Sequence, residues 1–167
     1  MSRTYTKQEA AEFMERMLKG EMGESEMAAL LTELAERGET VEELTGMAEV
    51  MRAFVNPVRG FEKAMDTCGT GGSGLPRVNV STMTAFVLVA GKVPVAKHGN
   101  RAAGGRCGSF DVLEKLGAKI ELGPEQVEET LKKLGIGFMF APFYHPAMKH
   151  VMPVRKALRR RTVFNLL

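Results

Sequence analysis

Hydrophobic residues in the first sixty positions recur every three or four residues, and this spacing predicts three short amphipathic helices. The first is expected to open at a capping box, in which the side chains of Thr6 and Glu9 each accept the other's backbone N–H. The second is expected over about residues 25–37. The third is expected to open at another capping box, Thr40 with Glu43.

Three such helices enclose only a thin core. We therefore expect their apolar stripes to pack on the rest of the chain or on a second copy, and we predict a homodimer through these helices. This part of the chain shows no candidate catalytic group. The stripes consist of Ala10, Phe13, Met14, Met17, Leu18, Met27, Leu30, Leu31, Leu34, Val41, Leu44, Met47 and Met51.

From residue 64 onward, short apolar segments alternate with helical patterns, which predicts parallel strands joined by right-handed crossovers. The predicted class is α/β, with a small helical domain at residues 1–62 and a parallel-sheet domain at residues 63–167. In such sheets ligands bind beyond the carboxyl ends of the strands. The predicted strands are 64–68, 93–97, 119–122 and 136–141, and the predicted helices are 81–91, 109–116, 124–134 and about 145–158.

Two glycine-rich segments, "DTCGTGGSG" at 66–74 and "HGNRAAGGRCG" at 98–108, follow predicted strands. Glycine lets successive backbone N–H groups turn toward one point, where they bind an anion, although a glycine turn without a ligand is also common. The second segment adds the cations Lys97 and Arg101 and the amide of Asn100. Two such loops at successive strand ends predict a pocket for a polyphosphate-bearing ligand.

Composition narrows the class of protein. With 44% hydrophobic and 26% charged residues, the 167-residue chain is typical of a soluble globular protein. Its longest apolar run, 85–91, is too short to span a bilayer, and its first residues lack the apolar core of a signal peptide, so we expect a cytoplasmic protein. We expect Cys68 and Cys107 to be reduced thiols rather than a disulfide or a metal site.

Charge is unevenly distributed along the chain. Residues 1–60 carry seven Lys and Arg against twelve Asp and Glu, whereas residues 61–167 carry sixteen against eight. The second part is therefore expected to favour an anionic ligand.

The segments "GTGG", "NVST", "VAKHGNR", "GSFDVLEKLG", "FMFAPFYHPAMK", "VRKAL" and "RTVFNLL" resemble, in order and spacing, anthranilate phosphoribosyltransferase. The KHGNR run is the most specific, because the related nucleoside phosphorylases differ there. The resemblance implies the fold of the nucleoside phosphorylase/phosphoribosyltransferase class. It also implies transfer of a phosphoribosyl group from phosphoribosyl pyrophosphate to anthranilate, with Mg²⁺, in tryptophan biosynthesis. The products would be N-(5'-phosphoribosyl)anthranilate and pyrophosphate.

The same resemblance implies which residues meet each ligand. Anthranilate would meet Gly69, Asn100 and Arg155, and Mg²⁺ would meet Ser81. His98 is a candidate proton acceptor, no other catalytic residue is assigned, and a structural role for His98 stays open. Phosphoribosyl pyrophosphate would be held by Gly69, Gly72, Ser73, Asn79, Val80, Ser81, Thr82, Lys97, His98, Gly99, Asn100, Arg101, Ala102, Ala103, Gly104, Gly105 and Ser109.

Two assignments near the end of the chain have alternatives. Arg155 is also one of six bases in "HPAMKHVMPVRKALRRR", which read alone is a solvated helix face. His145 and Pro146 either shape the entry of the aromatic substrate or serve structural roles.

The sequence also departs from the family's pattern. The family has Asp where Ser73 stands, Thr where Arg77 stands and Ala where Phe110 stands, with serines in place of Gly104 and Gly105. It also continues into a second half with an Asp–Glu pair that binds Mg²⁺, a pair that this sequence lacks. We therefore expect a fragment, a split enzyme with a partner chain, or an oligomer that covers an exposed apolar sheet edge and face.

Two other functions stay open at this point. One is a non-enzymatic relative that binds nucleic acid or another polyanion through its basic C-terminal residues, with an affinity that falls steeply with salt. The other is an enzyme of the nucleoside phosphorylase type.

Overall fold

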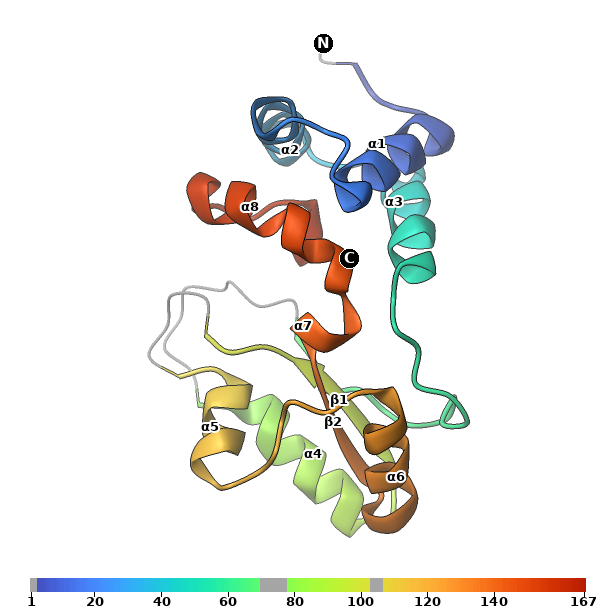
Figure 1. Ribbon diagram of the computed structural model, residues 1–167, viewed down its shortest axis with the longest axis vertical. Coiled ribbons are helices and arrows are strands. Elements are labelled where there is room, and N and C mark those ends of the chain that lie inside the picture. The colour runs from blue at the N-terminus through green and yellow to red at the C-terminus, as the bar shows by residue number, and fades with distance from the viewer. Residues whose placement is uncertain (1–2, 70–77, 103–106) are drawn as a thin grey trace. The chain divides into compact units, whose positions relative to one another are not determined.

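The structure is a computed structural model that describes residues 3–69, 78–102 and 107–167 (Figure 1). The chain divides into two compact units. The helical unit comprises Met1–Val55 and Pro146–Leu167, and the sheet unit comprises Asn56–His145. The predicted boundary near residue 62 differs from this division, because the last 22 residues pack with the N-terminal helices.

The helical unit contains the three predicted helices, and both predicted capping boxes are present at the first and third of them. The chain leaves the first helix through Gly20, whose φ of 74° suits glycine. The elements of this unit are α1 (Lys7–Lys19), α2 (Glu24–Arg37), α3 (Val41–Ala53), the 3₁₀ helix η1 (Pro146–His150), α8 (Met152–Leu158) and the 3₁₀ helix η2 (Val163–Asn165).

The core of the helical unit joins the two ends of the chain. Buried Met14, Leu31 and Met47 from the first three helices share one apolar cluster with Val151 and Val163. The predicted stripes therefore pack on the rest of the chain, as one of the two expected arrangements. The expected core position of Val41 is wrong, since its side chain is 76% exposed in the first turn of α3.

Helix α3 approaches α1 closely at a glycine. A Cβ at Gly46 would lie 2.1 Å from the carbonyl oxygen of Lys7, so only glycine permits this approach. The close packing explains why α3 buries Gly46 and Met47.

The sheet unit pairs two parallel strands, with Val95 opposite Ile136 and Gly99 opposite Phe140. The predicted strand at 64–68 is reduced to one parallel bridge between Met65 and Val95. The elements of this unit are α4 (Val80–Ala90), β1 (Val95–Gly99), α5 (Ser109–Lys115), α6 (Pro124–Leu134), β2 (Ile136–Phe140) and α7 (Ala141–Tyr144).

Two predicted elements are wrong. Residues 119–122 form no strand in the described chain, because the N–H of Leu122 bonds back to the carbonyl of Ile120 and the side chain of Ile120 anchors the segment in the core. The single helix predicted over about 145–158 is broken into η1 and α8, because Pro146 and Pro153 interrupt it.

Alternation along the strands sends side chains to two different layers. Gly137 of β2 faces α6, where a Cβ would lie 2.7 Å from Val127. Phe138 and Phe140 face the other way and pack edge-on or stacked against Phe110 of α5. In the register of the sheet Lys97 lies opposite Phe138, which places its side chain in the layer of α4 and α5.

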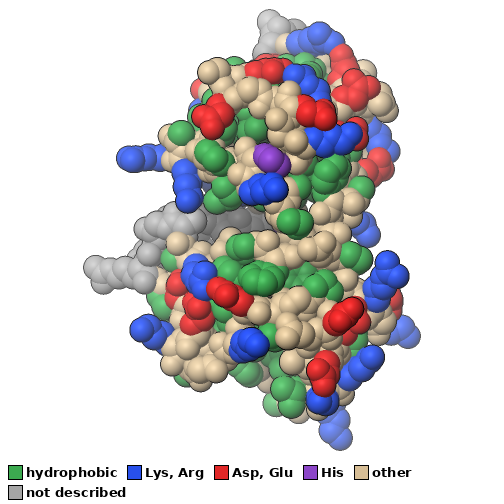
Figure 2. Space-filling view, in the orientation of Figure 1, with side chains coloured by type: hydrophobic (Ala, Val, Ile, Leu, Met, Phe, Trp, Pro, Cys, Tyr) green, Lys and Arg blue, Asp and Glu red, His purple; other side chains and the backbone are tan. Residues whose placement is uncertain are grey.

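One face of α4 is exposed and apolar. The exposed side chains on this helix are Val80, Met83, Phe86 and Val87, each at least 46% accessible. Among the described residues, every helix is too short or too polar to cross a membrane. Charged side chains of both signs are spread over the visible face of the molecule in Figure 2.

The buried carboxylate of Glu43 ties the start of the chain to α2 and α3. It accepts hydrogen bonds from the guanidinium of Arg37 and from the backbone N–H groups of Tyr5 and Thr40. Burial alone would raise the pKa of Glu43, but these donors outweigh it and lower the pKa to about 2. This carboxylate therefore stays ionised inside the helical unit.

We predict that Glu43→Gln lowers the free energy of unfolding at neutral pH by about 3 kcal/mol, because it leaves the largely buried Arg37 with only the more distant Glu33, at 3.8 Å, as a counter-charge. Glu49→Gln is the matched control, since Glu49 pairs with Lys7 at an exposed site and its loss should cost under about 1 kcal/mol. The depressed pKa stabilises the fold above the ordinary value of 4.5, and this stabilisation is lost as the pH falls toward 2. Denaturant unfolding at several pH values measures both effects, and equal losses for the two variants would contradict the prediction.

Candidate functional site

The side chain of Lys97 connects the segments that follow the two glycine-rich loops. Its Nζ donates to Oγ of Ser81, near the start of α4, at 3.2 Å. Oγ of Ser81 lies 3.2 Å from Oγ of Ser109, the first residue of α5. The first turns of the two helices that follow the loops therefore meet at one lysine. A common pocket formed by the loops themselves stays a prediction.

Lys97 is 1% exposed, which is rare for a lysine whose described partners include no carboxylate in hydrogen-bond contact. Burial lowers the pKa of Lys97, and the charges of Cys68 and Asp66 oppose that shift. A buried ammonium with only a hydroxyl partner is an attractive site for an anion.

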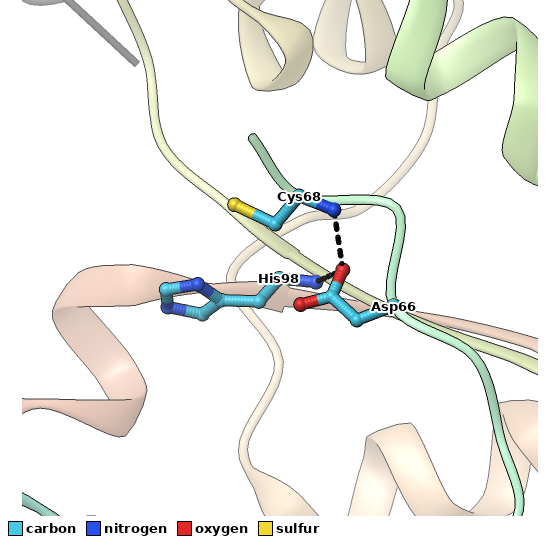
Figure 3. Close-up of side chains that lie close together, drawn as sticks. All are labelled: Asp66, Cys68 and His98. Carbon is cyan, nitrogen blue, oxygen red and sulfur yellow. Dashed lines mark hydrogen bonds between the residues drawn. The ribbon is translucent and has the colours of Figure 1, made fainter. Parts of the chain in front are cut away.

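The carboxylate of Asp66 organises the carboxyl end of β1 (Figure 3). Its Oδ1 accepts the backbone N–H groups of Cys68 at 2.9 Å and His98 at 3.1 Å. If residues 65–68 had continued to pair with β1, a backbone carbonyl would have accepted the N–H of His98. The carboxylate of Asp66 takes the place of that carbonyl. The chain at Cys68 is thereby fixed beside the strand just before the first glycine-rich loop.

His98 lies edge-on against the ring of His145, with 5.2 Å between the ring centroids. Burial lowers the pKa of His98, while Asp66 raises it and Lys97 lowers it further. Burial and the charge of His98 also lower the pKa of His145. Both imidazoles are therefore neutral at pH 7, the form in which His98 can accept a proton.

Around the second loop, the carboxylate of Asp111 holds together the two flanking segments. Its Oδ2 accepts the N–H groups of Ala102 at 2.9 Å and Gly108 at 2.6 Å. These two hydrogen bonds lower the pKa of Asp111, so the fastening persists under acidic conditions. Asn100 turns its Oδ1 back to the N–H of Arg101 at 2.8 Å.

The guanidinium of Arg101 is paired within the protein. It donates to both oxygens of Glu114, at 2.7 and 2.8 Å, and to Glu121 at 3.3 Å. It also lies 4.6 Å above the ring of Phe140. In this arrangement Arg101 fixes the loop against α5, and a contact between its side chain and a phosphate stays a prediction.

The remaining predicted residues are distributed as follows. Asn79 caps α4 without a side-chain hydrogen bond among the described residues, and the hydroxyl of Thr82 is buried without a described partner. Arg155 belongs to the helical unit, where its guanidinium lies 5.4 Å from the ring of Phe164 and burial lowers its pKa. Outside the described residues lie Gly72, Ser73, Ala103, Gly104 and Gly105.

The family model for the glycosyl transferase family, a/b domain, matches residues 61–167, and the model for the helical bundle domain of the same family matches residues 2–55. The chain belongs to this glycosyl transferase family. The two domains of this family, a helical bundle followed by an α/β domain, agree with the predicted fold class.

Two similar members of this glycosyl transferase family are both anthranilate phosphoribosyltransferases. Anthranilate phosphoribosyltransferase of Rubrobacter xylanophilus is 55% identical over 95% of this chain and 46% of its own length. The same enzyme of Methanothermobacter marburgensis is 50% identical over 99% of this chain and 48% of its own length. The chain thus spans about half the length of the curated relatives it matches.

Solved structures of family members are also similar. The crystal structure of anthranilate phosphoribosyltransferase from Thermus thermophilus matches 98% of this chain and 50% of its own, with a TM-score of 0.92 and 47% identity. The enzyme of Saccharomyces cerevisiae in complex with PRPP and Mg matches 97% of this chain and 49% of its own, with a TM-score of 0.86 and 25% identity.

Sequence reasoning missed the two carboxylates that organise the site, Asp66 and Asp111. A signal was present for Asp111, because it stands three residues after Gly108 at the N3 position of α5, where a carboxylate can accept the N–H of the N-cap residue. The role of Asp66 depends on pairing between distant segments and had no local signal. The ring of Phe110, which stands where the family has Ala, lies in the core against Gly99, where a Cβ would come within 2.8 Å of it.

We predict that Gly108→Ala destabilises the sheet unit, because the new Cβ would lie 2.5 Å from the backbone nitrogen of Ala102. Overpacking of this kind costs roughly 1–3 kcal/mol. Gly123→Ala is the matched control, since Gly123 caps α6 with a similar backbone conformation and has open space around it. Thermal unfolding of both variants measures the difference, and an unchanged Tm for Gly108→Ala would refute the close approach.

Proposed function

We propose that this chain forms the phosphoribosyl-binding half of an anthranilate phosphoribosyltransferase. The observation that supports the proposal is the buried lysine between the first turns of α4 and α5, Lys97 bonded to Ser81 with Ser109 beside it. Relatives that are 50–55% identical over nearly the whole chain carry that name, which favours this function over the polyanion-binding and nucleoside phosphorylase alternatives.

In the proposed reaction the bond between C1 of the ribose and pyrophosphate breaks, and the amine of anthranilate takes the place of pyrophosphate. Positive charge develops on the ribose and negative charge on the leaving group. The ammonium of Lys97 and the N–H groups at the start of α4 would stabilise that negative charge. The residues predicted for this ligand are those given by the resemblance, from Gly69 to Ser109.

Mg²⁺ is the proposed metal, since the similar yeast structure contains PRPP and Mg. One described feature suits Mg²⁺ and another opposes it. The hydroxyl of Ser81 offers an oxygen ligand, whereas the positive charge of the neighbouring Lys97 disfavours a cation that has no bound anion. Ser81 would therefore hold Mg²⁺ together with the phosphates of the substrate, and the ion would neutralise charge on the departing pyrophosphate.

Anthranilate is the proposed acceptor. Its carboxylate would pair with the guanidinium of Arg155, a group that burial leaves poorly solvated. Gly69 and Asn100 would complete its contacts. His98, held neutral by burial, would accept the proton that the amine loses during transfer.

The proposal extends to the assembly and location of the protein. A polypeptide equivalent to the other half of the relatives' length would cover the exposed apolar face of α4, formed by Val80, Met83, Phe86 and Val87. A homodimer through the N-terminal helices also stays part of the proposal, with the exposed side chain of Val41 as its support. A cytoplasmic location is proposed with it, in keeping with two free cysteines.

We predict that isothermal titration detects binding of phosphoribosyl pyrophosphate with Mg²⁺ present, and that Lys97→Met weakens it by roughly 10- to 100-fold. A hydrogen bond to a charged group contributes about 1.5–3 kcal/mol, which sets this range. Lys115→Met is the control, because Lys115 is an exposed lysine at the end of α5. Absence of binding by folded wild-type chain at millimolar ligand, or an equal loss in the control, would overturn the proposed site.

We predict that activity appears when this chain is mixed with the part of the Thermus thermophilus enzyme that it does not match. Consumption of anthranilate, followed by its fluorescence, should require both polypeptides. Met83→Glu on α4 should weaken the complex, whereas Leu134→Glu, a comparably exposed apolar position on α6, should not. Turnover by the mixture that is unaffected by Met83→Glu would refute the assigned docking face while leaving the chemistry in place.

A further inference from the structure

The pairing of residues 65 and 95 brings three metal-binding side chains together near the carboxyl end of β1. Met65 bridges Val95 in parallel register, and continuing that register sets Cys68 level with His98. Ligand atoms of Asp66, Cys68 and His98 all lie within 4.8 Å of one another (Figure 3). We propose that these three residues bind a divalent cation of borderline softness, with Zn²⁺ as the expected occupant.

The carboxylate of Asp66 is oriented by the two residues that supply the other ligands. Its Oδ1 accepts the N–H of Cys68 and the N–H of His98, so the three residues are fastened together by their backbone before any ion arrives. Backbone hydrogen bonds of this kind hold a metal-binding carboxylate in place. Within the described part of the chain, the second oxygen, Oδ2, makes no hydrogen bond and is available to an ion.

The ring of His98 lies half-buried beside the other two side chains. Its Nδ1 is the ring nitrogen that faces Cys68 and Asp66 in Figure 3, so Nδ1 would be the metal ligand. The other ring nitrogen, Nε2, is buried without a hydrogen-bond partner among the described residues.

The donor set selects the kind of ion. One sulfur, one nitrogen and one oxygen, with a fourth position left for water, is a combination typical of zinc, whereas Mg²⁺ and Ca²⁺ prefer oxygen ligands. Ligands around one tetrahedral zinc lie roughly 3–4 Å apart, given bond lengths of about 2.0–2.3 Å. Small rotations of the three side chains therefore close the site.

The local charges allow a dication. A thiolate at Cys68 and the carboxylate of Asp66 together balance two positive charges, while Lys97, which interacts electrostatically with both, opposes them and is directed to Ser81. The site differs from the Mg²⁺ position proposed at Ser81 and does not rest on the proposed function. A metal bound to the ring of His98 would take the place of a proton there, so His98 would not act as the proposed proton acceptor while the ion is bound. It revises the expectation of a plain thiol for Cys68 and leaves that expectation for Cys107.

Cobalt titration tests the site, because Co²⁺ substitutes for Zn²⁺ and gives a sulfur-to-metal charge-transfer band when a thiolate binds it. The purified, metal-free full chain should bind one Co²⁺ with this band, and Zn²⁺ should displace it. Cys68→Ser should abolish the band, and Asp66→Asn should weaken Zn²⁺ binding by at least about 10-fold. Cys107→Ser is the matched control, since Cys107 is the other exposed thiol, and it should retain the band at full intensity.

His98→Ala and His150→Ala form a second matched pair, in which only the former should weaken binding, and circular dichroism establishes that each variant is folded. The site is refuted if the folded wild-type chain gives no charge-transfer band with Co²⁺. It is also refuted if Cys107→Ser removes the band as fully as Cys68→Ser, or if binding survives unchanged in His98→Ala.

Discussion

A hydrogen-bonded connection links three elements of the sheet unit, from the ammonium of Lys97 on β1 through the hydroxyl of Ser81 on α4 to that of Ser109 on α5. Strand alternation directs Lys97 into the layer of α4 and α5, the same layer in which Phe138 and Phe110 form the apolar core. A charge in that position costs free energy that hydroxyl groups offset only in part. The fold therefore retains a cation at the place where two loops lead into two helices.

Two carboxylates make this arrangement possible by bonding to backbone rather than to cations. Asp66 supplies the acceptor that ends the pairing of residue 65 with β1, and Asp111 joins the segments on either side of the second loop. Because each carboxylate is satisfied by N–H groups, neither forms an ion pair with Lys97 among the described residues. Arg101 shows the contrast, since Glu114 and Glu121 take up its charge.

The sequence predicted those parts of the fold that local patterns determine. The capping boxes at Thr6 and Thr40 and the helix from Pro124 to Leu134 could be predicted, because each follows from local spacing. The role of Asp66 and the inward charge of Glu43 could not, because they depend on contacts between residues more than thirty positions apart. The break between η1 and α8 was within reach, since prolines mark it.

The lowered pKa of Lys97 links the site to stability in a definite direction. Burial makes the charged lysine unfavourable, so the protonated ammonium weakens the sheet unit. An anion bound beside Nζ would restore the pKa of Lys97 toward its ordinary value, and the free energy recovered would strengthen binding of the anion. The exposed apolar face of α4 runs along the same helix, from Val80 to Val87. An anion would stabilise the polar first turn of α4, and another polypeptide would stabilise its apolar face. Because both would bind the same helix, binding of the anion and binding of the polypeptide would strengthen each other.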